Sequence, residues 1–323
     1  MSIVVSVVIP TYRRTDLLKR CVKALLLQKF PKDQFEIIVV SDGPDADTGR
    51  IFDEWAGYDH PAIRFMPMDE KKGPAAARNY GWLNARGHII AFTDDDCIPD
   101  SHWLDAIVRN CNPDENIALT GKVIVPVSKR PTDYELNTAN LQTADFITAN
   151  CACTKKALVQ AGGFDEQFSM AWREDSELEF KFINNDIPIK RIETAIVTHP
   201  VRKCPWGVSI KEQKKTMFDA LLYKKHPQLF LKKIRPKSPV LYYVIITAFI
   251  VLLAGVLAHK PQMTIAGLAI WAVCTAYFIF KRLKVTKLSV NHITEMVLTS
   301  LIIPFVSVYW QWYGAVKYRV LFI

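Results

Sequence analysis

Three consecutive aspartates, Asp94, Asp95 and Asp96, follow the apolar run 89–92, which predicts a short buried strand, and Pro99 stops its continuation. Adjacent carboxylates repel one another, so a fold that gathers them usually holds a cation. Mg²⁺ and Mn²⁺ prefer oxygen ligands and often share them with substrate phosphates. The triplet therefore predicts that Asp94 and Asp96 bind the metal–diphosphate of an activated substrate. A solvated acidic turn or a helix N-cap is the alternative.

A second candidate anion site begins at Gly73-Pro74, which opens a predicted helix with three alanines in its first turn and then Arg78. A helix start carries free N–H groups and a partial positive charge, so it attracts anions. Arg78 could add a two-pronged contact to a phosphate. The alternative is an alanine-rich packed helix with a surface arginine.

Asp175 and His199 are candidates farther along the chain. Asp175 lies near the start of a predicted helix, where it is either a capping residue or a general base that takes a proton from an attacking hydroxyl. His199 follows the predicted strand 189–197, and it is either a metal or phosphate ligand or a packed histidine.

In the first part of the chain, β-branched runs alternate with segments that have helical spacing. The predicted strands are 4–9, 35–40 and 63–66, and the predicted helices are 15–28 and 46–57. This alternation predicts a doubly wound α/β sheet with right-handed crossovers. Ligands of such sheets bind outside the carboxyl ends of the strands, where Thr11, Asp42 and Asp94 all fall.

The regular alternation fades beyond the acidic triplet. A strand is predicted at 118–127 and a short helix at 154–160. The polar stretch 129–140 predicts a mobile loop.

Charge is divided unevenly along the 323 residues, a length that allows one large or two modest domains. Residues 224–323 contain 13 Lys and Arg and one acid, Glu295, whereas residues 1–223 contain 28 basic and 31 acidic residues. Because the basic third also holds the apolar runs, the charge indicates a membrane surface and not nucleic acid. Seven cysteines without a C-x-x-C pair argue against a zinc site and for reduced thiols. The N-terminus predicts a strand and not a signal peptide.

Three uncharged runs of 20 or 21 residues, 239–258, 261–280 and 296–316, are long enough to cross a bilayer, although Pro304 and several polar residues weaken the third. A buried helix pair in a soluble protein is the alternative. Lys and Arg flank the runs in a pattern that places the preceding domain in the cytoplasm. We expect a catalytic domain at 1–208, a basic amphipathic segment at 209–238 on the membrane surface, and a membrane domain at 239–323 with two to three transmembrane helices.

Six segments, in order, resemble the motif series of the family 2 glycosyltransferases. They are residues 8–13, 39–43, 73–79, 92–99, 162–166 and 172–178. The resemblance implies the GT-A fold, a doubly wound mixed sheet with a D-x-D motif. It also implies a nucleotide-diphosphate sugar as donor and a divalent cation, Mn²⁺ or Mg²⁺.

The resemblance also implies roles for individual residues. The nucleoside would contact Pro10, Thr11, Tyr12 and Asp42, and the diphosphate would lie near Arg78, Asp94 and Asp95. The metal would be held by Asp94 and Asp96, to which the position of His199 adds a third candidate. The base would be Asp175. The acceptor side would include Gly162, Gly163, Phe164, Asp165, Trp172 and Glu174.

The expected function is that of an inverting glycosyltransferase, which moves one sugar from a nucleotide-diphosphate sugar, a UDP-sugar, to a lipid-linked or growing cell-surface glycan. The Gln-x-x-Arg-Trp motif of processive synthases is absent from 206–215, which favours a single transfer. The alternatives are a synthase that glycosylates polyprenyl phosphate and a non-catalytic membrane scaffold. Neither G-x-G-x-x-G after the first strand nor a P-loop is present, which disfavours an oxidoreductase and an NTPase. We expect a multi-pass protein of the cell inner membrane.

Overall fold

The computed structural model describes residues 2–55, 61–234 and 239–321, and it divides into two compact units. The first, here called the sheet unit, comprises residues 1–126 and 140–201. The second, the helical unit, comprises residues 127–139 and 202–323.

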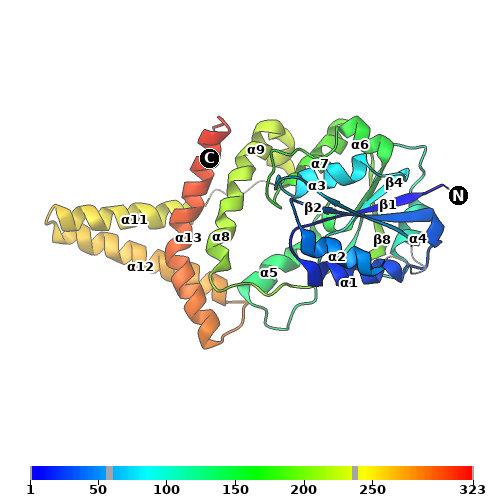
Figure 1. The fold of residues 1–323 in the computed structure, drawn as a ribbon. Coiled ribbons are helices and arrows are strands. Elements are labelled where there is room, and N and C mark those ends of the chain that lie inside the picture. Colours follow the sequence, from blue (N-terminus) through cyan, green and yellow to red (C-terminus); the bar gives the residue numbers. More distant parts are fainter. Residues whose placement is uncertain (1, 56–60, 235–238, 322–323) are drawn as a thin grey trace. The chain divides into compact units, whose positions relative to one another are not determined.

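One mixed eight-stranded sheet, counted over the described residues, forms the centre of the sheet unit (Figure 1). The strands, in spatial order, are β3 (Ala62–Pro67), β2 (Phe35–Ser41), β1 (Val5–Thr11), β4 (Ile89–Phe92), β7 (Cys151–Thr154), β6 (Ala118–Ile124), β8 (Ile189–Thr198) and β5 (Ile98–Pro99). The first four are parallel, β7 runs antiparallel to both of its neighbours, and β6 is parallel to β8. The predicted α/β architecture with a mixed sheet is therefore confirmed.

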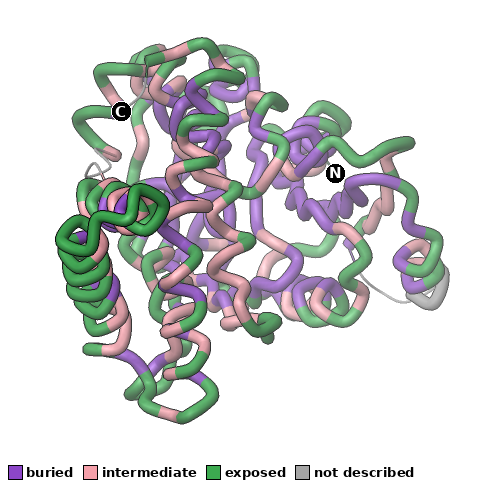
Figure 2. Tube along the Cα trace, turned by 90° about the vertical axis from the view of Figure 1, so that its left-hand side faces the viewer, coloured by how far each residue is buried: buried purple, intermediate pink, exposed green. Residues whose placement is uncertain are grey.

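Strand β1 shows why this sequence forms a doubly covered sheet. Every residue of β1 is buried, as expected for a central parallel strand. Because side chains alternate across a strand, Val7 and Ile9 pack on one face with α1 (Thr15–Leu26), whereas Val8 packs on the other with α3 (Pro74–Leu83). Figure 2 shows buried stretches of the chain in the interior and exposed residues on the outer turns of the coils.

The remaining helices of the sheet unit cover the two faces. They are η1 (Lys32–Gln34), α2 (Ala46–Trp55), α4 (Trp103–Asn110), η2 (Asn140–Thr143), η3 (Thr148–Asn150), α6 (Lys155–Ala161) and α7 (Glu174–Asn184). The predicted helices at 15–28, 46–57 and 154–160 correspond to α1, α2 and α6, although residues 56 and 57 lie outside the described part of the chain.

The helical unit consists of helices and their connections. They are α5 (Asp133–Ala139), α8 (Val208–Glu212), η4 (Gln213–Thr216), α9 (Met217–Lys225), α10 (Pro227–Leu229), the π-helix η5 (Phe230–Ile234), α11 (Val240–Leu257), α12 (Pro261–Leu283) and α13 (Val290–Lys317). The last three are long and apolar enough to cross a membrane.

The expectation of a mobile loop at 129–140 is wrong, because α5 forms there. Its start is a capping box in which the Thr132 N–H donates to Glu135 Oε2 over 2.6 Å and the Glu135 N–H donates to Thr132 Oγ1 over 3.2 Å. Asp133 is also ion-paired with Arg282 of α12 over 2.8 Å. The T-x-x-E spacing was the local signal for this helix.

Helices α11 and α12 form a closely packed hairpin. A Cβ added to Gly267 would lie 2.5 Å from the Leu252 backbone nitrogen, and one added to Gly255 would lie 2.6 Å from that of Thr264. Small residues thus allow the two backbones to approach, as is common between membrane helices. Only 17% of the apolar 18-residue stretch of each of these two helices is buried.

Candidate active site

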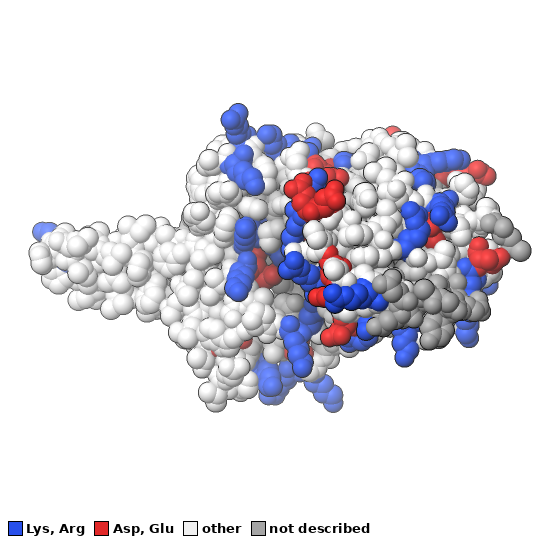
Figure 3. Space-filling model, viewed as in Figure 1, with Lys and Arg blue, Asp and Glu red and all other residues white. Residues whose placement is uncertain are grey.

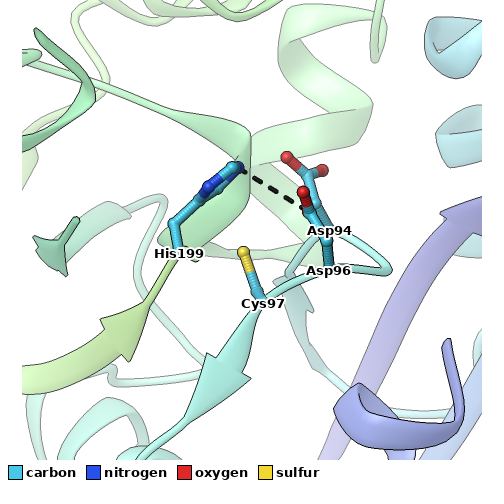
Figure 4. A group of neighbouring side chains, drawn as sticks. All are labelled: Asp94, Asp96, Cys97 and His199. Atoms are coloured by element: carbon cyan, nitrogen blue, oxygen red, sulfur yellow. Dashed lines mark ion pairs between the residues drawn. The ribbon is translucent and has the colours of Figure 1, made fainter. Parts of the chain in front are cut away.

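The acidic triplet and His199 meet at the carboxyl ends of β4 and β8. Strand β8 pairs with β5 and β6 and ends at Thr198, so His199 follows directly. His199 Nε2 lies 3.6 Å from Asp96 Oδ1, and both side chains are buried (Figure 4). Ligand atoms of Asp94, Asp96, Cys97 and His199 all lie within 4.8 Å of one another.

This group has the chemistry of a site for a hard divalent cation. Two carboxylates and an imidazole suit Mn²⁺ or Mg²⁺. His199 Nδ1 is buried, and within the described residues it has no hydrogen-bond partner. Burial, together with the charges of Asp94 and Asp96, raises the pKa of Cys97 well above its usual value. Sulfur is also a soft ligand, which a hard cation does not prefer. The residues present therefore fit a divalent cation held by oxygen and nitrogen.

The central aspartate of the triplet faces a different direction. Asp95 is buried, accepts a hydrogen bond from Thr11 Oγ1 over 2.8 Å and lies 3.4 Å from Arg14 Nη1. These contacts attach the turn after β4 to the end of β1. The structure thus brings Asp95 next to Thr11. Both carboxylate oxygens of Asp95, which the sequence suggested as contacts of the sugar donor, have partners within the protein.

Arg78 joins the metal-binding aspartates to the start of α7. It is buried; its Nη2 lies 2.7 Å from Asp94 Oδ1 and its Nη1 lies 3.3 Å from Glu174 Oε1. Burial alone would lower the pKa of Arg78, but Asp94 and Glu174 outweigh burial and raise it. The guanidinium therefore stays charged between two acids that are 80 residues apart in sequence.

Glu174 and Asp175 are adjacent in sequence but differ in environment. Glu174 is buried against Arg78, and burial followed by the charge of Asp175 raises its pKa to about 7. Asp175 is only half-buried, and its Oδ1 accepts the Ser176 N–H over 2.7 Å. Burial raises the pKa of Asp175. The charge of Asp94 raises this pKa further, whereas the charge of Arg78 lowers it. Asp175 is thus the more accessible carboxylate of the pair.

The nucleoside candidates gather at the ends of β1 and β2. Pro10 is buried within β1 opposite Val40, and Tyr12 is half-buried with Lys71 Nζ 3.9 Å from its ring centroid. Asp42 Oδ1 accepts the N–H groups of Lys72 and Gly73 over 2.7 and 2.8 Å. Asp42 therefore anchors the start of α3, the helix that carries Arg78.

The predicted acceptor residues follow α6. Gly162 has φ +75° and ends that helix, and Gly163 has φ +65°. Phe164 is buried edge-on against Phe92, with its ring 5.7 Å from Arg78 Cζ. Phe164 thus packs against the strand before the acidic triplet and against Arg78.

Asp165 and Trp172 lie in the loop before α7. Asp165 accepts the Gln167 N–H over 2.9 Å, and the Arg173 guanidinium lies 4.8 Å above the Trp172 ring. Both side chains are half-buried.

Asn79 is a positioning residue to which the sequence analysis assigned no role. Its Oδ1 accepts the N–H of Phe164 and the indole N–H of Trp82, and its Nδ2 donates to Phe164 O, each over 2.9 Å. Asn79 thereby fastens the glycine turn to α3. Its place directly after Arg78 in a matched motif was the available signal.

Comparison with known proteins agrees with this geometry. Residues 6–164 match the model of the family described as "Glycosyl transferase family 2". Glycosyltransferase AglE of Haloferax volcanii is 36% identical over 102 residues, which cover 31% of this chain and 33% of the relative. Chondroitin synthase of Escherichia coli is 25% identical over 279 residues, 73% of this chain and 40% of the relative. Probable glycosyltransferase YdaM of Bacillus subtilis is 27% identical over 210 residues, 59% of this chain and 49% of the relative. This chain thus spans between a third and a half of the length of these relatives.

Solved structures share the fold. The mannosyltransferase PcManGT from Pyrobaculum calidifontis, solved with GDP-Man and Mn²⁺, has a TM-score of 0.55 and 20% identity, covering 98% of this chain and 86% of that one. S. aureus TarS 1–349 has a TM-score of 0.51 and 15% identity, covering 98% and 89%. The sheet unit of this chain is therefore a glycosyltransferase family 2 domain with the GT-A fold.

Proposed function

We propose that this protein is an inverting glycosyltransferase that moves one sugar from a UDP-sugar to a lipid-linked or growing cell-surface glycan. The observation that carries the proposal is the continuous chain of contacts from Asp94 through Arg78 to Glu174, with Asp175 beside it. It joins a cation-binding group to a candidate base within one unit.

The donor would bind along the carboxyl ends of β1, β2 and β4. Asp42 and Tyr12 would contact the nucleoside, and Asp94, Asp96 and His199 would hold the cation that binds the diphosphate. When bound, the cation neutralises charge on the departing diphosphate. Arg78 lies next to Asp94, so its positive charge partly compensates the negative charges of the site before the donor binds.

Asp175 is the proposed general base. Its partner Glu174 is buried and engaged with Arg78, whereas Asp175 remains accessible to an acceptor. Its raised pKa strengthens its hold on a proton, as a base requires. The carboxylate would take the proton of the acceptor hydroxyl, whose oxygen forms the new bond to the anomeric carbon as the bond to the diphosphate breaks. Attack opposite the leaving group inverts that centre.

The membrane helices and their flanking charge support the proposed location. The sheet unit would face the cytoplasm at the cell inner membrane, where nucleotide sugars are available, and its acceptor would be presented at the membrane. The similarity to chondroitin synthase, which by its name builds a glycan, also supports the proposal of a glycan acceptor.

The test is transfer and binding by the purified full-length protein with a panel that includes UDP- and GDP-sugars, each with Mn²⁺, Mg²⁺ or chelator. The panel needs both nucleotides because TarS was solved with UDP and the mannosyltransferase with GDP-Man. We expect Asp175→Asn to keep donor binding while transfer falls about 100-fold or more, the usual contribution of a general base. We expect Asp96→Ala to weaken metal-dependent nucleotide binding.

Asp114→Asn is the matched control, because that side chain is 89% exposed and pairs only with the surface residue Lys156 in the described contacts. It should leave binding and transfer unchanged. Full transfer by Asp175→Asn would remove this residue as the base, and retention of the sugar's anomeric configuration in the product would contradict the single displacement.

A further inference from the structure

Helix α13 is long enough to span a membrane, yet its contacts within the helical unit are those of a helix at the surface. We propose that α13 lies along the membrane surface, on the side from which the chain enters α11, with its exposed apolar stripe in the boundary between headgroups and acyl chains. The chain would then cross the membrane twice, through α11 and α12. The proposal concerns the helical unit alone and does not depend on the transferase activity.

The first evidence is where α13 meets the hairpin of α11 and α12. Phe305 lies against Phe249 at 5.4 Å between ring centroids, and Ile303 packs with Ile245 and Phe278. Arg282 Nη1 donates to the hydroxyls of Thr299 and Ser300 over 2.7 and 3.0 Å.

These contacts involve the middle of α13 and the half of the hairpin that contains the start of α11 and the end of α12, as far as Phe249. At the other end, Leu253, Leu257 and Ile265 are exposed. Figure 1 likewise shows α13 crossing the base of the hairpin. A third spanning helix would instead run beside the other two along their length.

The second evidence is that the lysine-rich segment 207–225 packs along α13 on both sides of this crossing. The Gly207 N–H donates to Glu295 Oε1 over 2.7 Å near the start of α13. Near its end, a Cβ on Gly314 would lie 2.5 Å from Met217 O, and Lys224 Nζ donates to Tyr318 O over 2.8 Å.

Segment 207–225 contains five lysines, at 211, 214, 215, 224 and 225. If α13 crossed the bilayer, this segment would have to enter the hydrocarbon with it. Lysines are strongly disfavoured there.

The third evidence is the direction of the apolar surface of α13. Its apolar stripe has spacings of four and three residues, which place the members on one helix face. The stripe comprises Leu298, Ile302, Phe305, Tyr309, Trp312 and Val316. Phe305, which touches the hairpin, belongs to this stripe, so the apolar face of α13 continues the apolar surface of the hairpin.

The opposite face of α13 is buried in the unit, where the apolar Met296 and Ile303 lie among small and polar residues. It includes His292, Thr299, Ser300, Ser307 and Gly314. An exposed apolar face that continues into a transmembrane hairpin, with tyrosine and tryptophan on it and lysines beside it, fits a lipid surface with anionic headgroups.

The charge distribution supports two crossings. Figure 3 shows the hairpin almost free of blue and red along its length, with blue at its tip. With α13 at the surface, Lys317 and Arg319 stay on the same side as the loop at 284–289 and the segment before α11. Lys260 is then the only Lys or Arg of residues 224–323 on the far side.

Cysteine labelling of the full chain in membranes tests this topology. The background carries Cys204→Ser and Cys274→Ser, since the other five cysteines are buried. Single cysteines are then introduced as Val159→Cys in the sheet unit, His259→Cys at the hairpin turn and Leu321→Cys after α13, all at exposed positions. A membrane-impermeant maleimide is applied to intact cells and to inverted vesicles.

We expect Val159→Cys and Leu321→Cys to react in the same preparation and His259→Cys to react at least tenfold more strongly in the other. Labelling of Leu321→Cys together with His259→Cys, opposite to Val159→Cys, would overturn the proposal.

Spin labels at positions 298, 302, 309 and 316 provide an independent readout in vesicles that contain anionic lipid. A surface helix gives shallow and similar depths at all four positions. A maximum of depth at 302 and 309, with shallow values at 298 and 316, would also overturn the proposal.

Discussion

The two units of this protein differ in how many large apolar residues they leave exposed. In the sheet unit, β1 and β2 are buried along their whole length, and the acids collect in one place at the ends of the strands. In the helical unit, apolar side chains such as Val273 and Ile265 are 68% and 67% exposed, whereas Thr299 and Ser300 are fully buried.

This difference is expected if the long helices of the helical unit contact lipid and the sheet unit contacts water. Apolar residues avoid water, so the sheet unit encloses them. In lipid that driving force is lost, and helices associate through small and polar residues. A charge is therefore costly on the outside of the hairpin and inside the sheet unit alike, unless a partner compensates it, as Asp94 and Glu174 do for Arg78.

The largest effect should come from removing that compensation in the sheet unit. Arg78→Met leaves the buried Glu174 and the partly buried Asp94 without their cation, and we expect a loss of roughly 3–5 kcal/mol of folding free energy. Urea denaturation of the detergent-solubilised protein measures it. Arg109→Met is the control, because Arg109 forms an exposed i,i+4 pair with Asp105 and should cost less than about 1 kcal/mol. Equal losses in the two variants would show that the Arg78 pairs contribute no more than a surface pair.

The comparison of solvents is sharpest at two valines with nearly the same exposure. Val273 in α12 is 68% exposed and Val159 in α6 is 65% exposed. Val273→Lys should disfavour membrane insertion by about 2.5–3.5 kcal/mol, since a lysine near the centre of a spanning helix must leave water. Val159→Lys should stay within about 0.5 kcal/mol, as most surface substitutions do.

The measurement is the fraction of expressed protein that resists alkaline extraction from membranes, together with its stability in detergent. Normal insertion of the Val273→Lys protein would mean that this face of α12 does not contact lipid.

A smaller effect separates two neighbouring glycines of the sheet unit that share a positive φ. A Cβ on Gly163 would lie 2.8 Å from Asn79 Oδ1 and 2.9 Å from the Trp82 ring, whereas one on Gly162 would meet nothing within 4 Å. Both alanine variants must adopt a positive φ, which is strained for alanine, but only Gly163→Ala also disturbs the Asn79 contacts. We expect about 1 kcal/mol for Gly162→Ala and roughly 1–3 kcal/mol for Gly163→Ala, read from thermal denaturation. Equal values would show that Asn79 can move without cost.

Much of the candidate site could be predicted from local sequence patterns. A strand followed by three carboxylates, a glycine-proline helix start and an apolar run of 20 residues are each encoded within a short stretch, because period and turn chemistry act over a few residues. For this reason β1, β4 and α11 form close to where the sequence predicts them. The T-x-x-E start of α5 was equally local and was overlooked.

The partners of the acidic residues were decided by the tertiary structure. Sequence spacing gave no reason for Asp95 to face Thr11, for Glu174 and not Asp175 to hold Arg78, or for His199 to lie 3.6 Å from Asp96. These contacts depend on the order in which strands pair, which joins residues 84 to 103 positions apart.

An acidic sheet edge in the first part of this chain and long apolar helices in its last part can both be predicted from local sequence pattern. The folded chain establishes which carboxylate is buried with a cation and which stays accessible, and on which side of α13 the lysine-rich segment packs. The physical reason is that periodicity fixes which face of an element is apolar, whereas packing between distant segments decides what that face meets.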